Sequence, residues 1–100
     1  MHKETKAKQI PYAVKRAVWR RDHGECILCH SPGTPVAHFI SRAQGGLGIE
    51  ENIVTLCDHC HRRFDQSEGR AKTKEMIRQY LKRQYPDWDE SKLYYRKENR

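Results

Sequence analysis

The chain has 100 residues, of which 36% are hydrophobic and 33% are charged. This length favours a single domain, and so small a core usually needs a disulfide or a structural metal as well. The sequence begins MHKETKAKQ, without the apolar segment of a signal peptide, and no apolar run approaches the length of a membrane span. We therefore expect a cytoplasmic protein without a membrane partner, in which paired cysteines favour metal binding over disulfides.

The net charge of +7 is distributed unevenly along the chain. Residues 1–21 carry seven Lys/Arg against one acid, and residues 62–100 carry twelve against seven. Residues 22–61 hold one basic residue and five acids. Two basic segments around a mildly acidic centre suit a polyanion held on both sides of a working site, such as nucleic acid. A basic surface without a partner is the alternative.

The N-terminal half is expected to contain one helix. The first nine residues are interpreted as disordered or as a basic arm. Residues 10–22, IPYAVKRAVWRRD, predict a helix, because four positions recur at the spacing of one helix face. These positions are Val14, Ala17, Val18 and Arg21. Gly24 is a typical residue at the C-terminal end of such a helix.

Two short strands are predicted next, at residues 36–40, VAHFI, and 53–56, IVTL, from their β-branched and aromatic content. The loop between them is rich in glycine. A helix is predicted from Asp58 to near Gly69. An amphipathic helix is predicted over residues 72–85, followed by a short final turn and a basic tail.

The four cysteines form two CxxC pairs, Cys26/Cys29 and Cys57/Cys60, with 27 residues between the pairs. The two sulfurs of one CxxC pair span an edge of a tetrahedron, and two pairs complete the coordination of a zinc ion. The pattern therefore predicts a structural zinc site, without the open position that a catalytic ion needs. A redox CxxC or buried free thiols are the alternatives.

Further metal-ligand types remain once the cysteines are assigned. His61 and Asp65 lie four residues apart, on one face of the predicted helix, where they suit a second ion with open positions. Strand alternation places His38 on the face opposite Ala37 and Phe39. His38 also stands at the head of an H-x13-N-x8-H series that ends at His61.

Three stretches carry a resemblance: RRDHGECILC, AHFISRAQGG and EENIVTLCDHCH. They resemble the HNH nuclease family, in its zinc-stapled branch, over about residues 15–66. The resemblance implies an α+β fold with a ββα-metal (His-Me finger) core, flanked by an N-terminal helix and C-terminal helices. We expect one HNH nuclease domain over residues 1–100, with a basic arm at 1–10, the core at about 34–68 and a helical extension at 70–100.

The resemblance also implies a metal-dependent hydrolysis of phosphodiester bonds in DNA, most readily double-stranded DNA. His38 takes the position of the general base that deprotonates the attacking water, and Asn52 holds the loop that aims it. His61 takes the metal-ligand position. The ion binds a non-bridging phosphate oxygen and the leaving 3′ oxygen. Limited sequence specificity is expected, with nicking of one strand or cleavage of both left open.

One position departs from the family pattern. Members often have Asp or His immediately before the base, as a second metal ligand, and this chain has Ala37. Either Asp65 replaces that ligand, which we favour, or the site binds metal poorly. The candidate ligands of the catalytic ion are His61, Asp65 and His38, and the ion is expected to be Mg²⁺, Mn²⁺, Ni²⁺ or Zn²⁺.

Three arginines are candidate contacts to DNA. Arg42, four residues after His38, is expected to hold the phosphate or to neutralise the transition state. Arg62 and Arg63 follow His61 and are expected to reach the DNA backbone. For all three, a solvated surface charge is the alternative.

The whole chain is similar to the small HNH proteins of bacteriophages and prophages, some of which are encoded beside the packaging terminase. That similarity implies a role in phage DNA packaging or processing inside the bacterial host, with terminase or portal proteins as partners. Two rival functions remain. One is a non-catalytic zinc module that binds nucleic acid, and the other is an accessory protein that docks on terminase.

Overall fold

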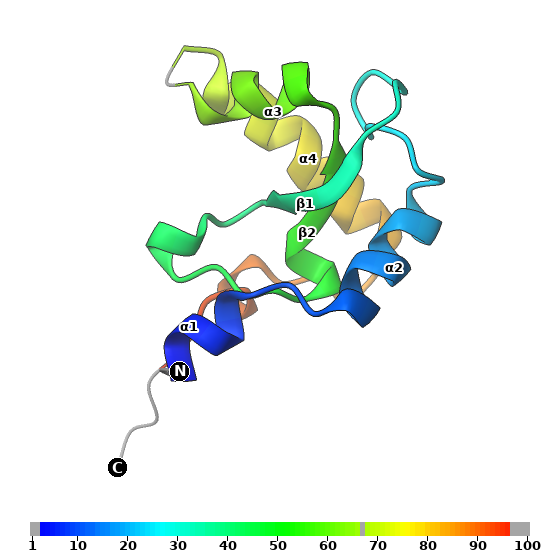
Figure 1. Ribbon diagram of the computed structural model, residues 1–100. Helices are drawn as coiled ribbons and strands as arrows, with labels where there is room; N and C mark the ends of the chain where they lie inside the picture. The colour runs from blue at the N-terminus through cyan, green and yellow to red at the C-terminus, as the bar shows by residue number, and fades with distance from the viewer. Residues whose placement is uncertain (1–2, 67, 97–100) are drawn as a thin grey trace.

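The computed structural model of the protein describes residues 3–66 and 68–96 (Figure 1). Its helices and strands are α1 (Lys3–Lys8), α2 (Tyr12–Arg21), β1 (Thr34–His38), β2 (Ile53–Leu56), α3 (Asp58–Asp65) and α4 (Arg70–Gln84). Short 3-10 turns lie at Arg42–Gln44, Glu50–Asn52 and Glu90–Lys92. β1 and β2 pair as an antiparallel hairpin. The expected small α+β fold, with an N-terminal helix, a hairpin and C-terminal helices, is therefore confirmed.

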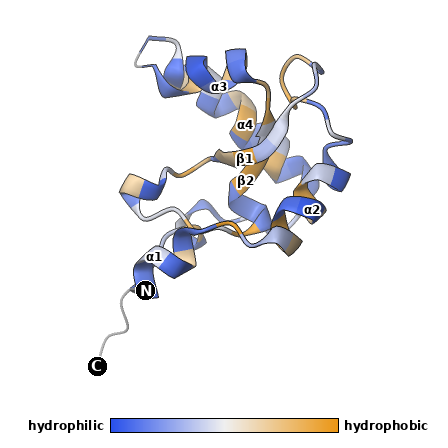
Figure 2. Ribbon diagram, viewed as in Figure 1, coloured by the Kyte–Doolittle hydropathy of each residue, from blue (hydrophilic) through white to orange (hydrophobic). Residues whose placement is uncertain are grey.

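The hydrophobic core lies between the hairpin and α4. All four residues of β2 are buried, as are Ile77 and Leu81 of α4. In Figure 2, β2 is coloured as hydrophobic, whereas α3 is mostly hydrophilic. Phe39 packs edge to face on Trp88, with ring centroids 5.6 Å apart, and the Trp88 indole N–H donates to the Glu51 carbonyl at 2.8 Å. The segment after α4 therefore folds back onto the hairpin and closes the core.

The glycine-rich loop between the strands is held by both ends of the chain. On one side, the Gly48 N–H donates to the Ala7 carbonyl of α1 at 3.0 Å. On the other, the Leu47 N–H donates to the Leu93 carbonyl at 2.9 Å. A Cβ atom at position 48 would lie 1.9 Å from the Gln9 carbonyl oxygen, so only glycine allows the N-terminal segment to approach so closely.

A buried ion pair joins α2 to the hairpin. Two guanidinium nitrogens of Arg21 donate to the Asp22 carboxylate at 2.7 and 3.0 Å, and a further bond reaches the Ile53 carbonyl at 2.7 Å. The Asp22 carboxylate in turn accepts the backbone N–H of Thr55 at 2.9 Å. Two adjacent side chains therefore satisfy the backbone of β2 on the side facing α2.

The same ion pair also holds α4. The Tyr80 hydroxyl donates to Asp22, and Arg21 donates to the Tyr85 hydroxyl at 3.0 Å. Burial acts to lower the pKa of Arg21, but Asp22 and Tyr85 outweigh it and raise that pKa above its ordinary value. Burial and the bond to Asp22 raise the pKa of Tyr80 to about 12. Both groups therefore stay protonated at neutral pH, and the network persists there.

Most predicted elements are confirmed, with shifted ends. β2 has the predicted bounds, whereas β1 begins two residues before position 36 and ends at His38, where Phe39 turns to bond with the Asn52 carbonyl. The helix that begins at Asp58 ends at Asp65, not near Gly69. Disorder was the wrong alternative for residues 3–8, which form α1. The end of the predicted basic tail, residues 97–100, lies outside the described residues.

We expect Asp22→Asn to lower the free energy of unfolding by about 3 kcal/mol, because it leaves the Arg21 charge without a partner in a buried place. Side-chain exposure is only 11% for Arg21 and 0% for Asp22. Urea unfolding of the zinc-loaded protein measures the change. Asp87→Asn makes the same substitution at an exposed position and should leave stability near that of the wild type. Equal stability of both variants would contradict the prediction.

Candidate metal centre and active site

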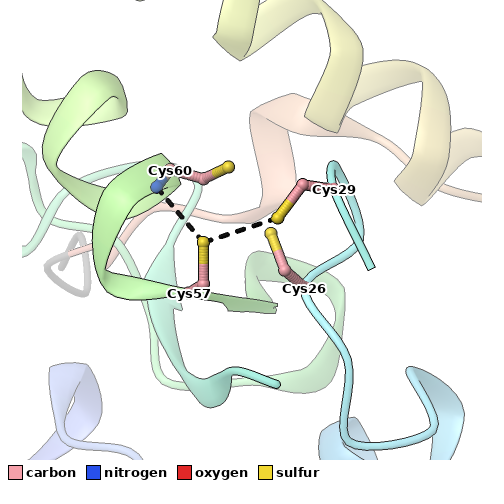
Figure 3. Close-up of side chains that lie close together, drawn as sticks. All are labelled: Cys26, Cys29, Cys57 and Cys60. Atoms are coloured by element: carbon pink, nitrogen blue, oxygen red, sulfur yellow. Dashed lines mark hydrogen bonds between the residues drawn. The ribbon is translucent and has the colours of Figure 1, made fainter. Parts of the chain in front are cut away.

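The four cysteines meet at the junction between the hairpin and α3 (Figure 3). Cys26 and Cys29 come from the loop before β1, Cys57 follows β2, and Cys60 lies in the first turn of α3. Their sulfurs all lie within 4.8 Å of one another. Zinc–sulfur bonds of about 2.3 Å in a tetrahedron place sulfurs about 3.8 Å apart. The observed cluster therefore fits a structural zinc ion.

Backbone hydrogen bonds shape the first cysteine pair into a tight turn. The Cys26 N–H donates to the Ser31 carbonyl at 2.7 Å, and the His30 N–H donates to the Cys26 carbonyl at 2.9 Å. His30 closes the turn with a φ of +68°. The Ile27 N–H donates to the Thr55 carbonyl at 3.0 Å, which fastens the turn to β2.

The thiols differ in how readily they lose a proton. Hydrogen bonding to Ser31, whose hydroxyl oxygen lies 3.3 Å from the Cys29 sulfur, lowers the pKa of Cys29 to about 6. Burial raises the pKa of Cys60. Zinc binds the thiolate form, and a bound cation favours that form even at a buried position.

His38 lies at the end of β1 and is half-buried. Its Nε2 atom is 3.0 Å from the Lys8 carbonyl oxygen, at the end of α1. A carbonyl oxygen can only accept a hydrogen bond, so Nε2 carries the proton and donates it. In the neutral ring the Nδ1 atom is then left with its lone pair, which is the state a general base requires.

The surroundings of His38 keep the ring neutral. Burial lowers the pKa of His38, the bond to the Lys8 carbonyl partly offsets this, and electrostatic interactions with Arg42 and His61 lower it further. The pKa of His38 is therefore below its ordinary value, and the imidazole is uncharged near pH 7.

Asn52 is fully buried and holds the chain directly after His38. Its Oδ1 accepts the Ile40 N–H at 2.8 Å, and its Nδ2 donates to the carbonyls of Ile40, at 3.1 Å, and Leu47, at 2.8 Å. Its backbone carbonyl accepts the Phe39 N–H at 2.7 Å. One side chain therefore joins the two ends of the glycine-rich loop.

His61 follows Cys60 directly in α3 and is half-buried, and Asp65 lies one turn later and is exposed. Ala37 is fully buried against the core and pairs with Val54, so no metal ligand comes from that position. Among residues 3–66 and 68–96, the cysteines are the one group of three or more His, Cys, Asp or Glu side chains gathered within 4.8 Å. The candidate ligands His38, His61 and Asp65 are not drawn together in this way.

Residues 26–66 match the family described as HNH endonuclease. This segment is an HNH endonuclease domain. It contains both cysteine pairs, the hairpin and α3, and with them His38, Asn52 and His61. No curated protein matches the chain. In the part of the chain that the structure describes, no helix is long and apolar enough to cross a membrane.

The arginines of the HNH domain lie on its surface. Arg42 is exposed and, with His38, lines a shallow hollow of about 410 Å³ that Gln9, Ile10, Lys15 and Val36 complete. Arg62 and Arg63 follow His61 directly in α3, and both are exposed. Their contact with DNA stays a prediction.

Sequence patterns did not reveal the contribution of Lys8 to this site. Lys8 acts through its backbone carbonyl, and every residue type offers the same oxygen. No side-chain signal distinguishes it. Only the packing of α1 against the glycine-rich loop brings that carbonyl to His38.

Removal of zinc is expected to unfold the HNH domain, because the cluster replaces hydrophobic core that so small a chain cannot supply. Cys57→Ser should lose bound zinc and the cooperative thermal transition seen by circular dichroism. Ser31→Ala, which changes a neighbour of the cluster but no ligand, should keep both. A Cys57→Ser variant that has lost its zinc yet melts at the same temperature as the zinc-loaded wild type would contradict a structural role for the ion.

Asn52→Asp is expected to destabilise the protein, because it removes both amide N–H donors and leaves two carbonyls without them. Each unsatisfied group costs about 1–3 kcal/mol in a buried place. Gln44→Glu is the matched control, since it converts an amide to a carboxylate on the exposed side of the same loop. Urea unfolding distinguishes them, and similar midpoints for the two variants would show that Asn52 does not hold the loop.

Proposed function

We propose that the protein is a metal-dependent DNA endonuclease of the HNH type, with His38 as the general base. The observation that supports this most directly is the hydrogen bond from His38 Nε2 to the Lys8 carbonyl. It commits one ring nitrogen to the protein and leaves the other available. That arrangement stands at the position which the HNH resemblance gives to the base.

In the proposed reaction, His38 Nδ1 accepts a proton from the water that attacks the phosphorus atom. The lowered pKa of His38 supports this role, since the ring is neutral and ready to accept a proton near pH 7. The Lys8 carbonyl keeps the ring from turning, and Asn52 keeps the following loop in place. Arg42, on the rim of the same hollow, is suited to bind the negatively charged phosphate.

His61 and Asp65 are the residues that would hold a catalytic divalent ion. An imidazole and a carboxylate one helical turn apart form a mixed donor set that accepts Mg²⁺, Mn²⁺, Ni²⁺ or Zn²⁺. When bound, such an ion supplies positive charge for the phosphate and the leaving 3′ oxygen. Asp65 replaces the metal-binding side chain that is absent at position 37, where this chain has Ala37.

The remaining assignments follow from the same proposal. The four-cysteine cluster holds a structural zinc ion, separate from the catalytic ion. Arg62 and Arg63 bind the DNA backbone from α3. The likeness to small phage HNH proteins supports a role in phage DNA packaging or processing in the host cytoplasm, beside terminase or portal proteins.

A non-catalytic nucleic-acid module is the second candidate, and the burial of Ala37 is the observation that favours it. With no ligand from that position, the catalytic ion would depend on α3 alone. In that case nucleic acid would bind to the basic surface without being cut.

Cleavage of supercoiled plasmid separates the two candidates. We expect cleavage with added Mg²⁺, Mn²⁺, Ni²⁺ or Zn²⁺, and a loss of about 10²–10⁴-fold in rate for His38→Ala, the range that a general base contributes. His59→Ala, an exposed histidine on α3, should cut at the wild-type rate. Zinc content is measured on every sample to show that the fold is intact.

Two results would decide against the nuclease. One is wild-type protein that carries its zinc and cuts nothing with any of the four ions. The other is His38→Ala that cuts as fast as the wild type. Either result would favour the non-catalytic nucleic-acid module over the nuclease.

A further inference from the structure

The outer face of α2 carries two large aromatic side chains that pack little against the rest of the protein. Tyr12 is 73% exposed and Trp19 is 52% exposed. They are seven residues apart, which is close to two helical turns, so they lie on the same face, about 10 Å apart along the axis. The inward face of this helix has Val18 buried and Val14 and Ala17 half-buried. These three side chains pack the helix against the protein without help from the two rings.

Three cations lie between and beside these rings: Lys15, Arg16 and Arg20. Rings and cations together line a broad hollow of about 690 Å³, which Pro35 of β1 borders on one side. The helix contains no acidic residue, and no ion pair involves these three cations among the residues that the structure describes. The hollow therefore presents positive charge that is not neutralised within the protein.

One edge of the Trp19 indole lies against Gly24. Gly24 has a φ of +69°, and a Cβ atom there would lie 2.8–2.9 Å from three indole atoms. Only glycine at this position lets the ring approach so closely. This contact restricts the ring on one side, and about half of the residue stays open to solvent for a ligand to stack on.

This surface is continuous with the candidate active site. Lys15 lines both the α2 hollow and the hollow that contains His38 and Arg42. Pro35 and Val36, adjacent in β1, line one hollow each. A strand of nucleic acid with its phosphate at His38 can therefore continue onto α2, and neither hollow is lined by an acidic residue of the described part of the chain.

We infer that the outer face of α2 binds unpaired nucleotides beside the scissile phosphate. Bases stack on Tyr12 and Trp19, and the phosphates between them contact the cations. Positive grooves with open aromatic rings bind single strands in this way, because every unpaired base offers a face to stack. Paired bases in a duplex keep their faces covered. The inference rests on the proposed nuclease function and adds a preference, among its DNA substrates, for a single-stranded segment next to the cut.

Binding is measured without a catalytic ion, on zinc-loaded protein, by fluorescence anisotropy of labelled DNA. The three probes are a single strand, a blunt duplex, and a duplex with a single-stranded tail. Trp19→Ala and Tyr12→Ala should each weaken binding of the single strand and of the tailed duplex by about 5- to 150-fold. Trp19→Phe keeps a ring and should recover most of that affinity. Binding of the blunt duplex should change little.

Two controls test the chemistry of the surface. Met76→Ala removes an exposed apolar side chain of α4, 47% exposed, and should leave all three affinities unchanged. Arg16→Gln should lower affinity for the single strand and reduce the slope of log K against log salt by about 0.7. Quenching of Trp19 fluorescence by the single strand, absent in Trp19→Phe, would report stacking directly.

Three outcomes overturn the inference. In the first, Trp19→Ala and Tyr12→Ala bind the single strand as tightly as the wild type does. In the second, they lose equal affinity for the blunt duplex and the single strand. The third is a wild type that binds the blunt duplex at least as tightly as the tailed one. Plasmid cleavage by the same preparation separates this failure from failure of the nuclease: a wild type that cuts plasmid keeps the nuclease in each of these cases. A wild type that cuts nothing yet shows the expected ring dependence keeps the α2 surface as a binding site.

Discussion

The four-cysteine cluster fixes the distance between the two halves of the candidate active site. His38 lies on β1, which follows the first cysteine pair, and His61 is the residue directly after Cys60. Closing the sulfurs around one point therefore positions β1 against α3, although the pairs are 27 residues apart in the sequence. The cluster takes no part in the proposed reaction, yet the placement of His38 relative to His61 depends on it. The structural zinc site and the proposed catalytic site share one short stretch of chain without sharing a ligand.

The Arg21–Asp22 pair holds the hairpin from the opposite side. Its partners are the backbone of β2, Tyr80 of α4 and Tyr85 directly after α4. One buried ion pair therefore links α2 to two elements that are distant in the sequence. Buried pairs of this kind add little to stability compared with an apolar core of the same size, but they specify which groups must meet. Together with the cysteine cluster, the pair fixes the position of the hairpin relative to α2 and α4.

Local patterns predicted the strands, the cysteine cluster and most helix positions, because spacing and turn chemistry act over a few residues. The expectation that Asn52 holds the loop came from the HNH resemblance and not from a local pattern. Other features required the whole fold. Arg21 recurs at the spacing of the apolar face of its helix, and nothing local distinguishes a charge paired with Asp22 from one on the surface. The ordering of α1 was missed for a similar reason: a short basic segment has no helical signal of its own, and its contacts with the glycine-rich loop stabilise it.

The bond between Lys8 and His38 means that the surroundings of His38 extend beyond the segment that defines the family. Residues 26–66 contain His38, but the oxygen that orients its ring comes from a helix that begins at Lys3. A fragment cut to the family boundaries would carry every signature residue with an imidazole free to rotate and to exchange tautomers. Substitutions that shift α1 would therefore change the orientation and tautomer of His38 without altering any residue of the motif.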